Sequence, residues 1–168
     1  VNENVVVTDG TVTIDLGGNR WSGDIEDGSF VPLTVNGGSV TLKNGNLFQW
    51  WSGSSALTGI VINGGSVTVG EDARVMGGVP DRNTKCPSIT LNGGTLVLKE
   101  GAVLLSGLQV PEGKVLANYL PEGTAFVKCS YDYDSGTVTV SDPQEFVSDI
   151  YTANKITEGM IVVSHTHD

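Results

Sequence analysis

Apolar and polar residues alternate along most of the chain in short runs that are separated by glycine-rich turns. Alternation with a period of two predicts β-strands that bury one face, because successive side chains of a strand point to opposite sides. The positions with inward parity are Leu33, Val35, Ile60, Ile62, Ile89 and Leu91 before the turns, and Val12, Ile14, Val40, Leu42, Val67, Val69, Leu96 and Leu98 after them.

These runs belong to a repeated phrase. NGG recurs at Asn36, Asn63 and Asn92, at intervals of 27 and 29 residues, and a weaker copy starts near Asp9. Each copy continues into a third apolar stretch that ends in RWSG, WWSG, VMGG or LLSG. Three short strands and three turns per copy predict an all-β chain in which each copy is one coil of a parallel β-helix. Antiparallel hairpins are the alternative, because NG and GG also favour two-residue turns, but the long interval between copies argues against them.

The repeated asparagines have a structural interpretation. In stacked coils, Asn36, Asn63 and Asn92 would lie about 4.8 Å apart, where each amide can donate to the carbonyl of the next. We therefore expect a buried asparagine ladder and do not expect these residues to bind a ligand.

Composition and charge narrow the function classes. The chain has 168 residues, of which 39% are hydrophobic and 23 are glycines, as expected for one globular domain. A net charge of −10 disfavours binding to nucleic acid or to anionic membrane surfaces. The apolar runs are too short for membrane insertion, and a sequence that begins with Val suggests a processed protein or an excised domain. Cys86 and Cys129 lack CxxC spacing, and whether they form a disulfide stays open.

The last third departs from the repeat. We expect the β-helix to occupy residues 1–128, and residues 129–168 to form a C-terminal cap with a β-hairpin from Tyr131, an irregular or helical cover from Pro143 and the start of a linker. Asp132, Asp134 and Asp142 are a weak Ca²⁺ candidate without DxDxDG density, and His165 and His167 have no third ligand in sequence. No cofactor and no metal site is expected.

The recurring xNGGSVTL and the xSG ends resemble the right-handed parallel β-helix domains of secreted and cell-surface bacterial proteins, over residues 5–117. That group includes polysaccharide lyases, pectinase-like hydrolases, carbohydrate-binding modules and adhesins. YLPEGTAF and the late IVVSHTHD also resemble segments of multidomain surface proteins of Gram-positive bacteria. The resemblance implies an extracellular module that is part of a larger multidomain chain.

Three variable loops follow the xSG ends and would leave the solenoid at one corner, beginning near Asp24, Ser54 and Val79. Binding residues concentrate on such loops because a rigid scaffold holds them. Adjacent Trp side chains on a strand point to opposite sides, so one of the pair at 50–51 is available for stacking on a sugar or for anchoring a protein. The candidate binding residues are Trp21, Trp50, Trp51, Phe30, Asp24, Glu26, Asp27, Asp81 and Arg82.

We therefore predict a non-catalytic binding or adhesion module for a glycan or a host protein. A carbohydrate-active β-helix enzyme is the alternative, and it would need outward carboxylates that converge with a Lys or Arg. The Ser and Thr residues on the outer face of the second strands also suggest an ice-binding array, but the interruption at Val97 argues against it.

Overall fold

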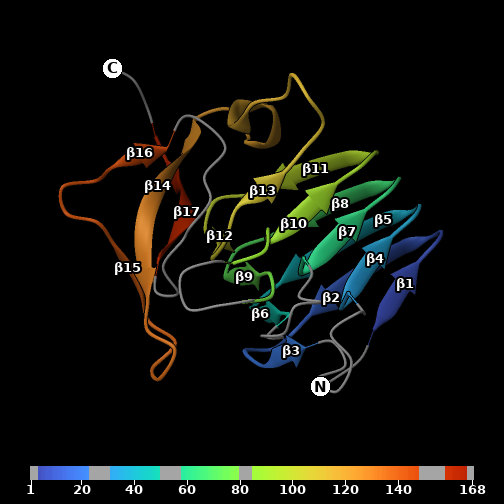
Figure 1. Cartoon of the computed structure of the whole chain (residues 1–168), viewed down its shortest axis with the longest axis horizontal. Helices are drawn as coiled ribbons and strands as arrows, with labels where there is room; N and C mark the ends of the chain where they lie inside the picture. The colour runs from blue at the N-terminus through green and yellow to red at the C-terminus, as the bar shows by residue number, and fades with distance from the viewer. Residues whose placement is uncertain (1–3, 23–30, 50–57, 80–84, 148–157, 166–168) are drawn as a thin grey trace.

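A computed structural model describes residues 4–22, 31–49, 58–79, 85–147 and 158–165. These residues form β-strands and one short 3₁₀ helix, η1 (Leu116–Tyr119), and the strands assemble into three sheets (Figure 1). Among the described residues, no helix has the length and apolar character needed to cross a bilayer. The all-β prediction is confirmed.

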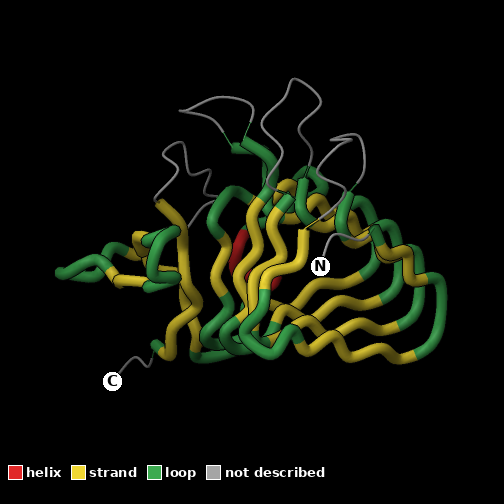
Figure 2. Tube along the Cα trace, turned by 90° about the horizontal axis from the view of Figure 1, so that it is seen from below, coloured by secondary structure: helices red, strands yellow, loops and turns green. Residues whose placement is uncertain are grey.

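Each copy of the sequence repeat contributes one strand to each sheet in turn. The first sheet has the order β1-β4-β7-β10-β13, the second β11-β8-β5-β2, and the third contains β12-β9-β6-β3. Pairing among these strands is parallel, so equivalent strands of successive repeats run side by side (Figure 2). Repeat one is β1 (Val5–Val7), β2 (Thr11–Asp15) and β3 (Arg20–Ser22), and repeat two is β4 (Leu33–Val35), β5 (Ser39–Lys43) and β6 (Gly45–Phe48). Repeat three is β7 (Ile60–Ile62), β8 (Ser66–Val69) and β9 (Ala73–Met76), and repeat four is β10 (Ile89–Leu91), β11 (Thr95–Leu98) and β12 (Val103–Leu104), followed by β13 (Leu108–Gln109).

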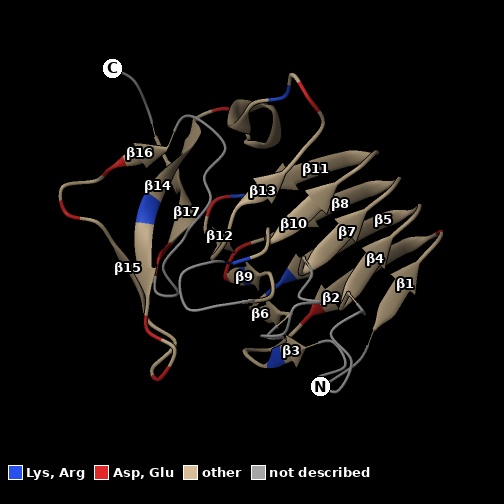
Figure 3. Ribbon diagram, viewed as in Figure 1, with Lys and Arg blue, Asp and Glu red and all other residues tan. Residues whose placement is uncertain are grey.

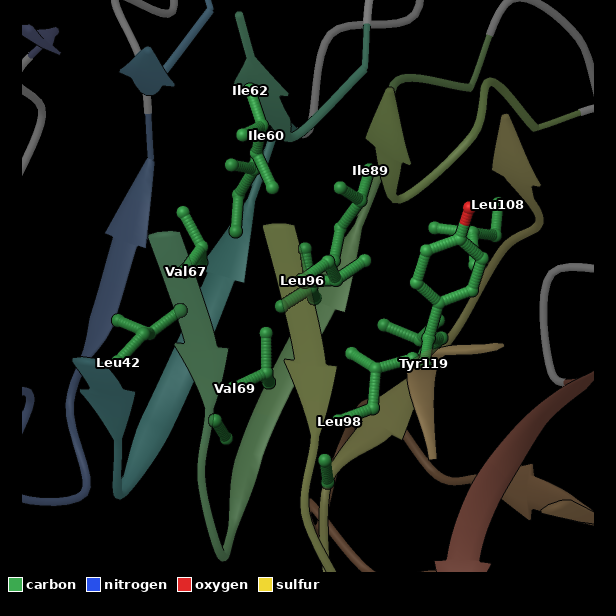
Figure 4. Packing of buried hydrophobic residues seen from close by; sticks show 14 of the residues in the cluster. Leu42, Ile60, Ile62, Val67, Val69, Ile89, Leu96, Leu98, Leu108 and Tyr119 are labelled. Carbon is green, nitrogen blue, oxygen red and sulfur yellow. The ribbon is translucent and has the colours of Figure 1, made fainter. Parts of the chain in front are cut away.

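The register stacks equivalent side chains on one another. Leu33 pairs with Ile60, which pairs with Ile89, and all three are fully buried. The strands on the two sides of an NGG turn belong to different sheets, so the alternative of antiparallel hairpins across these turns is wrong. The predicted inward positions of the first two sheets fill the interior (Figure 4), except that Val12 and Ile14 of repeat one are only partly buried. The third sheet adds Trp21, Leu47, Ala73 and Val75 to the same core. Full burial of one such aliphatic side chain stabilises the fold by about 1.5–3 kcal/mol. No repeat buries these faces alone, so stability comes from the stack.

The repeated asparagines form hydrogen bonds between repeats. Asn63 Nδ2 donates to Asn36 Oδ1 at 2.8 Å, and Asn92 Nδ2 donates to Asn63 Oδ1 at 2.9 Å. These side chains are exposed, however, so the expectation of buried amides is wrong. The reason is their place in the turn between two sheets, where the side chain lies outside the corner instead of between the sheets.

The C-terminal third extends the third sheet. β17 (Glu158–Ser164) pairs antiparallel with β12 on one side and with β14 (Thr124–Tyr131) on the other. β15 (Val138–Val140) and β16 (Phe146–Val147) pair with β14, while η1 buries Leu116 and Tyr119. We refer to β14–β17 as the cap.

The cap strands bear on the boundary that was expected at residue 128. The boundary expected at residue 128 falls inside β14, which begins seven residues before the predicted hairpin strand at Tyr131. Residues 158–164 belong to the cap, because they form a strand whose backbone pairs with β12 on one side and with β14 on the other. Their alternating apolar residues face the interior, with Met160 and Val162 in the main core.

Candidate ligand-binding site

The outer face of the third sheet carries a row of long polar side chains. Arg20 of β3 pairs in register with Asn46 of β6, which pairs with Arg74 of β9. Their chain neighbours Trp21, Leu47 and Val75 are buried in the main core, so alternation turns the row outward. Most Asp and Glu residues of the described chain lie instead in turns and connections (Figure 3).

A second apolar cluster lies on the same outer face, where the cap packs against the repeats. Phe48 and Met76 come from β6 and β9, and Cys129 and Tyr131 come from β14. The Tyr131 ring lies 6.0 Å from the Phe48 ring and 4.8 Å from the Tyr133 ring, both edge to face. This aromatic group attaches the cap to the repeats.

Polar contacts connect the row to the cap. Asn46 Nδ2 donates to the Tyr131 hydroxyl at 3.2 Å, and Arg74 Nη1 donates to the carbonyl of Gly136. The Arg74 guanidinium also lies 5.5 Å from the Tyr131 ring centroid, within the range of a cation–π interaction. Both the amide and the guanidinium are therefore held in position by the cap.

The connection between β14 and β15 has its own internal bonds. Asp132 Oδ1 accepts hydrogen bonds from the backbone N–H groups of Asp134 and Ser135, at 2.9 and 3.3 Å. These bonds lower the pKa of Asp132 below its usual value, because they stabilise the ionised carboxylate. Asp132, which the sequence suggested as a weak candidate Ca²⁺ ligand, thus stabilises the turn that contains Ser135 and Gly136.

A pocket of about 350 Å³ lies between the row and this turn. The repeats provide Asn44, Asn46, Asp72 and Arg74, and the cap provides Ser135. The remaining lining residues are the glycines Gly18, Gly45 and Gly136. The pocket is thus polar and is built jointly by three repeats and the cap.

The backbone turn before the third-sheet strands explains two of the lining residues. Asn44 and Asp72 both have φ of 58°, a left-handed conformation that Asn and Asp tolerate better than most residues. They occupy equivalent places in repeats two and three, one residue before Gly45 and Ala73, which are paired in register. Asn44 Nδ2 also donates to Asp15 Oδ1 of repeat one at 3.3 Å.

Asp15 and Asp132 both have pKa values below the usual value of an Asp carboxyl, so neither is suited to donate a proton near neutral pH. The pKa of Asp15 is lowered, first by the hydrogen bond from the Gly17 backbone and then by the Asn44 side chain. A general acid near neutral pH needs a raised pKa instead. Among the described residues, no group of three or more His, Cys, Asp or Glu side chains is placed to hold a metal ion.

Trp21 is the one predicted binding residue that the described ranges include. It is buried in the main core, and it lines an apolar cavity of about 590 Å³ at the end of repeat one, together with Val5, Val12, Ile14 and Leu16. Its register partner is Leu47, so the alignment of RWSG with WWSG, which would match Trp21 with Trp51, is wrong. The xSG ends suggested that match, but the strand pairing sets a different alignment.

The other predicted binding residues lie outside the described residues: Trp50, Trp51, Phe30, Asp24, Glu26, Asp27, Asp81 and Arg82. The strands that flank the three loops are described. Ser22, Phe48 and Met76 are in register at the ends of β3, β6 and β9, and Leu33, Ile60 and Ile89 are in register at the starts of the next strands. The loop ends are therefore anchored side by side, at the opposite end of β6 and β9 from the pocket.

Three further sequence candidates are placed by the structure. Cys86 and Cys129 are not joined in a disulfide. The His165 ring lies 4.8 Å from the Phe146 ring. On the outer face of the second sheet, Thr13, Thr41 and Thr68 are in register with one another and with Val97, as the alternation predicted.

Sequence reasoning missed the pocket residues Asn44, Asn46, Asp72 and Arg74. The sequence held one indication of them, because a residue that favours turns stands just before the third strand of two repeats: Asn44 in repeat two and Asp72 in repeat three. The contribution of Ser135 and Gly136 had no signal, because the cap reaches this face only through tertiary packing.

No family model, curated protein or solved structure matched the chain.

Proposed function

We propose that the chain is a right-handed parallel β-helix that serves as a non-catalytic binding module of an extracellular bacterial protein, and that it recognises a glycan or a host protein. The proposed site is the pocket between the outer face of the third sheet and the cap. The proposal keeps the function class expected from the sequence and moves the site away from the loop corner.

The rotation of the chain through three parallel sheets supports the solenoid. Each repeat passes through the first, second and third sheet in order and then returns to the first, with equivalent residues in register. Crossovers between parallel strands of one sheet are right-handed in nearly all proteins, which supports the right-handed form. The resemblance in sequence to bacterial surface β-helices points the same way.

The pocket is the observation that carries the binding function. Asn46 and Arg74 are oriented by the cap before any ligand arrives, and pre-oriented polar groups bind with a smaller loss of side-chain entropy. The pocket also lies within the usual size range for small-molecule sites. A carbohydrate or a polar protein segment fits such a surface better than an apolar ligand does.

A carbohydrate-active enzyme is the second candidate, because Asp72 and Arg74 line the same pocket. A hydrolase of the usual kind needs two carboxylates, one of them a proton donor. Asp72 is the one carboxylate among the described pocket residues. The arrangement therefore favours binding over turnover.

The test is a glycan array, together with a screen of immobilised host proteins, using the whole chain. We expect Asn46→Ala to weaken binding of the best hit at least tenfold, because it removes a lining amide. Thr41→Ala, on the outer face of the second sheet, is the matched control and should bind like the wild type.

Two results would overturn the proposal. Equal binding by the wild type and Asn46→Ala, with the footprint on Thr13, Thr41 and Thr68, would place the site on the second sheet. Release of reducing ends or of an ultraviolet-absorbing product, lost in Asp72→Asn, would identify an enzyme instead.

A further inference from the structure

The hydrogen-bonding capacity of the pocket is mixed. Asn46 uses one amide N–H to bond Tyr131, and Asn44 uses one to bond Asp15, so each retains a second N–H and its Oδ1. Arg74 adds donors that its bond to Gly136 does not use, and Asp72 adds acceptors. The pocket lining therefore offers both donors and acceptors.

The charges in the pocket nearly cancel. Arg74 is the one cation and Asp72 the one carboxylate among the lining residues, and the chain as a whole has a net charge of −10. A ligand carboxylate or sulfate offers acceptors only. That group would leave the Asn44, Asn46 and Asp72 oxygens without a donor, and its repulsion by Asp72 would offset its attraction to Arg74.

We infer that the pocket binds a neutral sugar unit, through hydroxyl groups that donate and accept at the same time, and that it discriminates against acidic sugars. Each sugar hydroxyl can accept from an Asn or Arg N–H while it donates to an Asn or Asp oxygen. A pocket of about 350 Å³ is near the lower end of the range for small-molecule sites, which suits roughly one or two sugar rings. This inference rests on the proposed binding function and specifies its ligand.

Asp72 is assigned as the residue that determines this specificity. It is exposed and has φ of 58°, so Asn can replace it with the same shape and with a backbone preference that suits the turn. Glu71, the exposed carboxylate next to it, does not line the pocket and provides the matched control.

The experiment uses pairs of oligosaccharides with the same linkage, one member with CH₂OH and the other with a carboxylate at C6. Binding to immobilised pairs is measured for the wild type, Asp72→Asn and Glu71→Gln, at low and high salt. We expect the wild type to prefer the neutral member of the bound pair at least tenfold and its affinity for that member to change little with salt. Asp72→Asn should reduce this preference at least threefold, whereas Glu71→Gln should retain it.

Each other outcome has a distinct meaning. Equal or stronger binding of the acidic member refutes the neutral-sugar assignment while it supports the binding function. An unchanged preference in Asp72→Asn, with an unaltered melting temperature, refutes the role of Asp72. If neither member of any pair binds and a host protein does, the sugar inference is wrong and the module is a protein-binding one. If nothing in either screen binds, the proposed function fails together with the inference.

Discussion

Replacing the second glycine of one NGG turn by alanine tests the stacking of the repeats directly. Gly65 has φ of 76°, and a Cβ added there would lie 2.5 Å from the Gly38 carbonyl oxygen of the preceding repeat. Gly10, at the equivalent turn of repeat one, has φ of 79°, but a Cβ there would meet nothing within 4 Å. The two substitutions therefore share the backbone strain and differ in the contact with a neighbouring repeat.

The magnitude follows from these two contributions. A left-handed conformation costs alanine about 1–2 kcal/mol, and the lower entropy of the unfolded alanine chain offsets about 0.4–1 kcal/mol of this. Gly10→Ala should therefore cost about 1 kcal/mol. In Gly65→Ala the new Cβ must also displace the backbone of the preceding repeat, and no side-chain rotamer change can relieve this clash. We expect the clash to cost a further 1–3 kcal/mol, roughly, of folding free energy. We expect a total of about 2–4 kcal/mol for Gly65→Ala.

Urea unfolding followed by circular dichroism measures both variants. With equal m-values, the free energy of unfolding of Gly65→Ala should lie about 2 kcal/mol below that of Gly10→Ala. Equal stabilities would show that the turns of adjacent repeats are not in close contact in solution. That result would refute the packing of the repeats on which the pocket also depends.

The same structure makes three further predictions. Asn63→Ala removes two exposed amide hydrogen bonds and Asn92→Ala removes one. In urea unfolding, Asn63→Ala should therefore lower the free energy of unfolding by about 1–2 kcal/mol, about twice the effect of Asn92→Ala, and equal decreases would contradict the ladder. Burial lowers the pKa of Lys85 to about 8 from its usual 10.5, so between these pH values the unfolded state binds more protons than the folded state. The wild type should therefore gain stability relative to Lys85→Met as the pH rises from about 8 to about 10, and a flat or falling difference would contradict the burial of Lys85. Burial raises the pKa of Cys129 to about 12, so its thiol should resist Ellman's reagent at pH 8 in the native protein and react in denaturant; rapid native labelling of Cys86→Ser would show that Cys129 is exposed.

The repeat architecture was predictable because it depends on short-range patterns. Alternation at Leu33 and Val35, and again at Val40 and Leu42, identifies an inward face without knowledge of any partner strand. The spacing of Asn36, Asn63 and Asn92 matches the register that brings their amides into contact. Their exposure was not predictable, since it depends on which side of the corner the side chain occupies.

The candidate site was predicted poorly, for physical reasons that differ between residues. Trp21 was a predicted binding residue because tryptophan is common at interfaces, but its parity in β3 turns it into the core. Arg74 gave no local signal, because its importance comes from the Gly136 carbonyl and the Tyr131 ring, which lie about 60 residues further along the chain.

The sequence by itself determined the strand pattern, the turn positions and the stacking of equivalent residues in the first two sheets, because these follow from alternation and from residues that local backbone geometry requires. Only the tertiary structure decided that β17 enters the third sheet between β12 and β14, and that this brings the cap over the outer face of β6 and β9. The order of strands in a sheet depends on the total burial of distant segments, which no short stretch encodes. The pocket exists only because that burial places Ser135 beside Asn46 and Arg74.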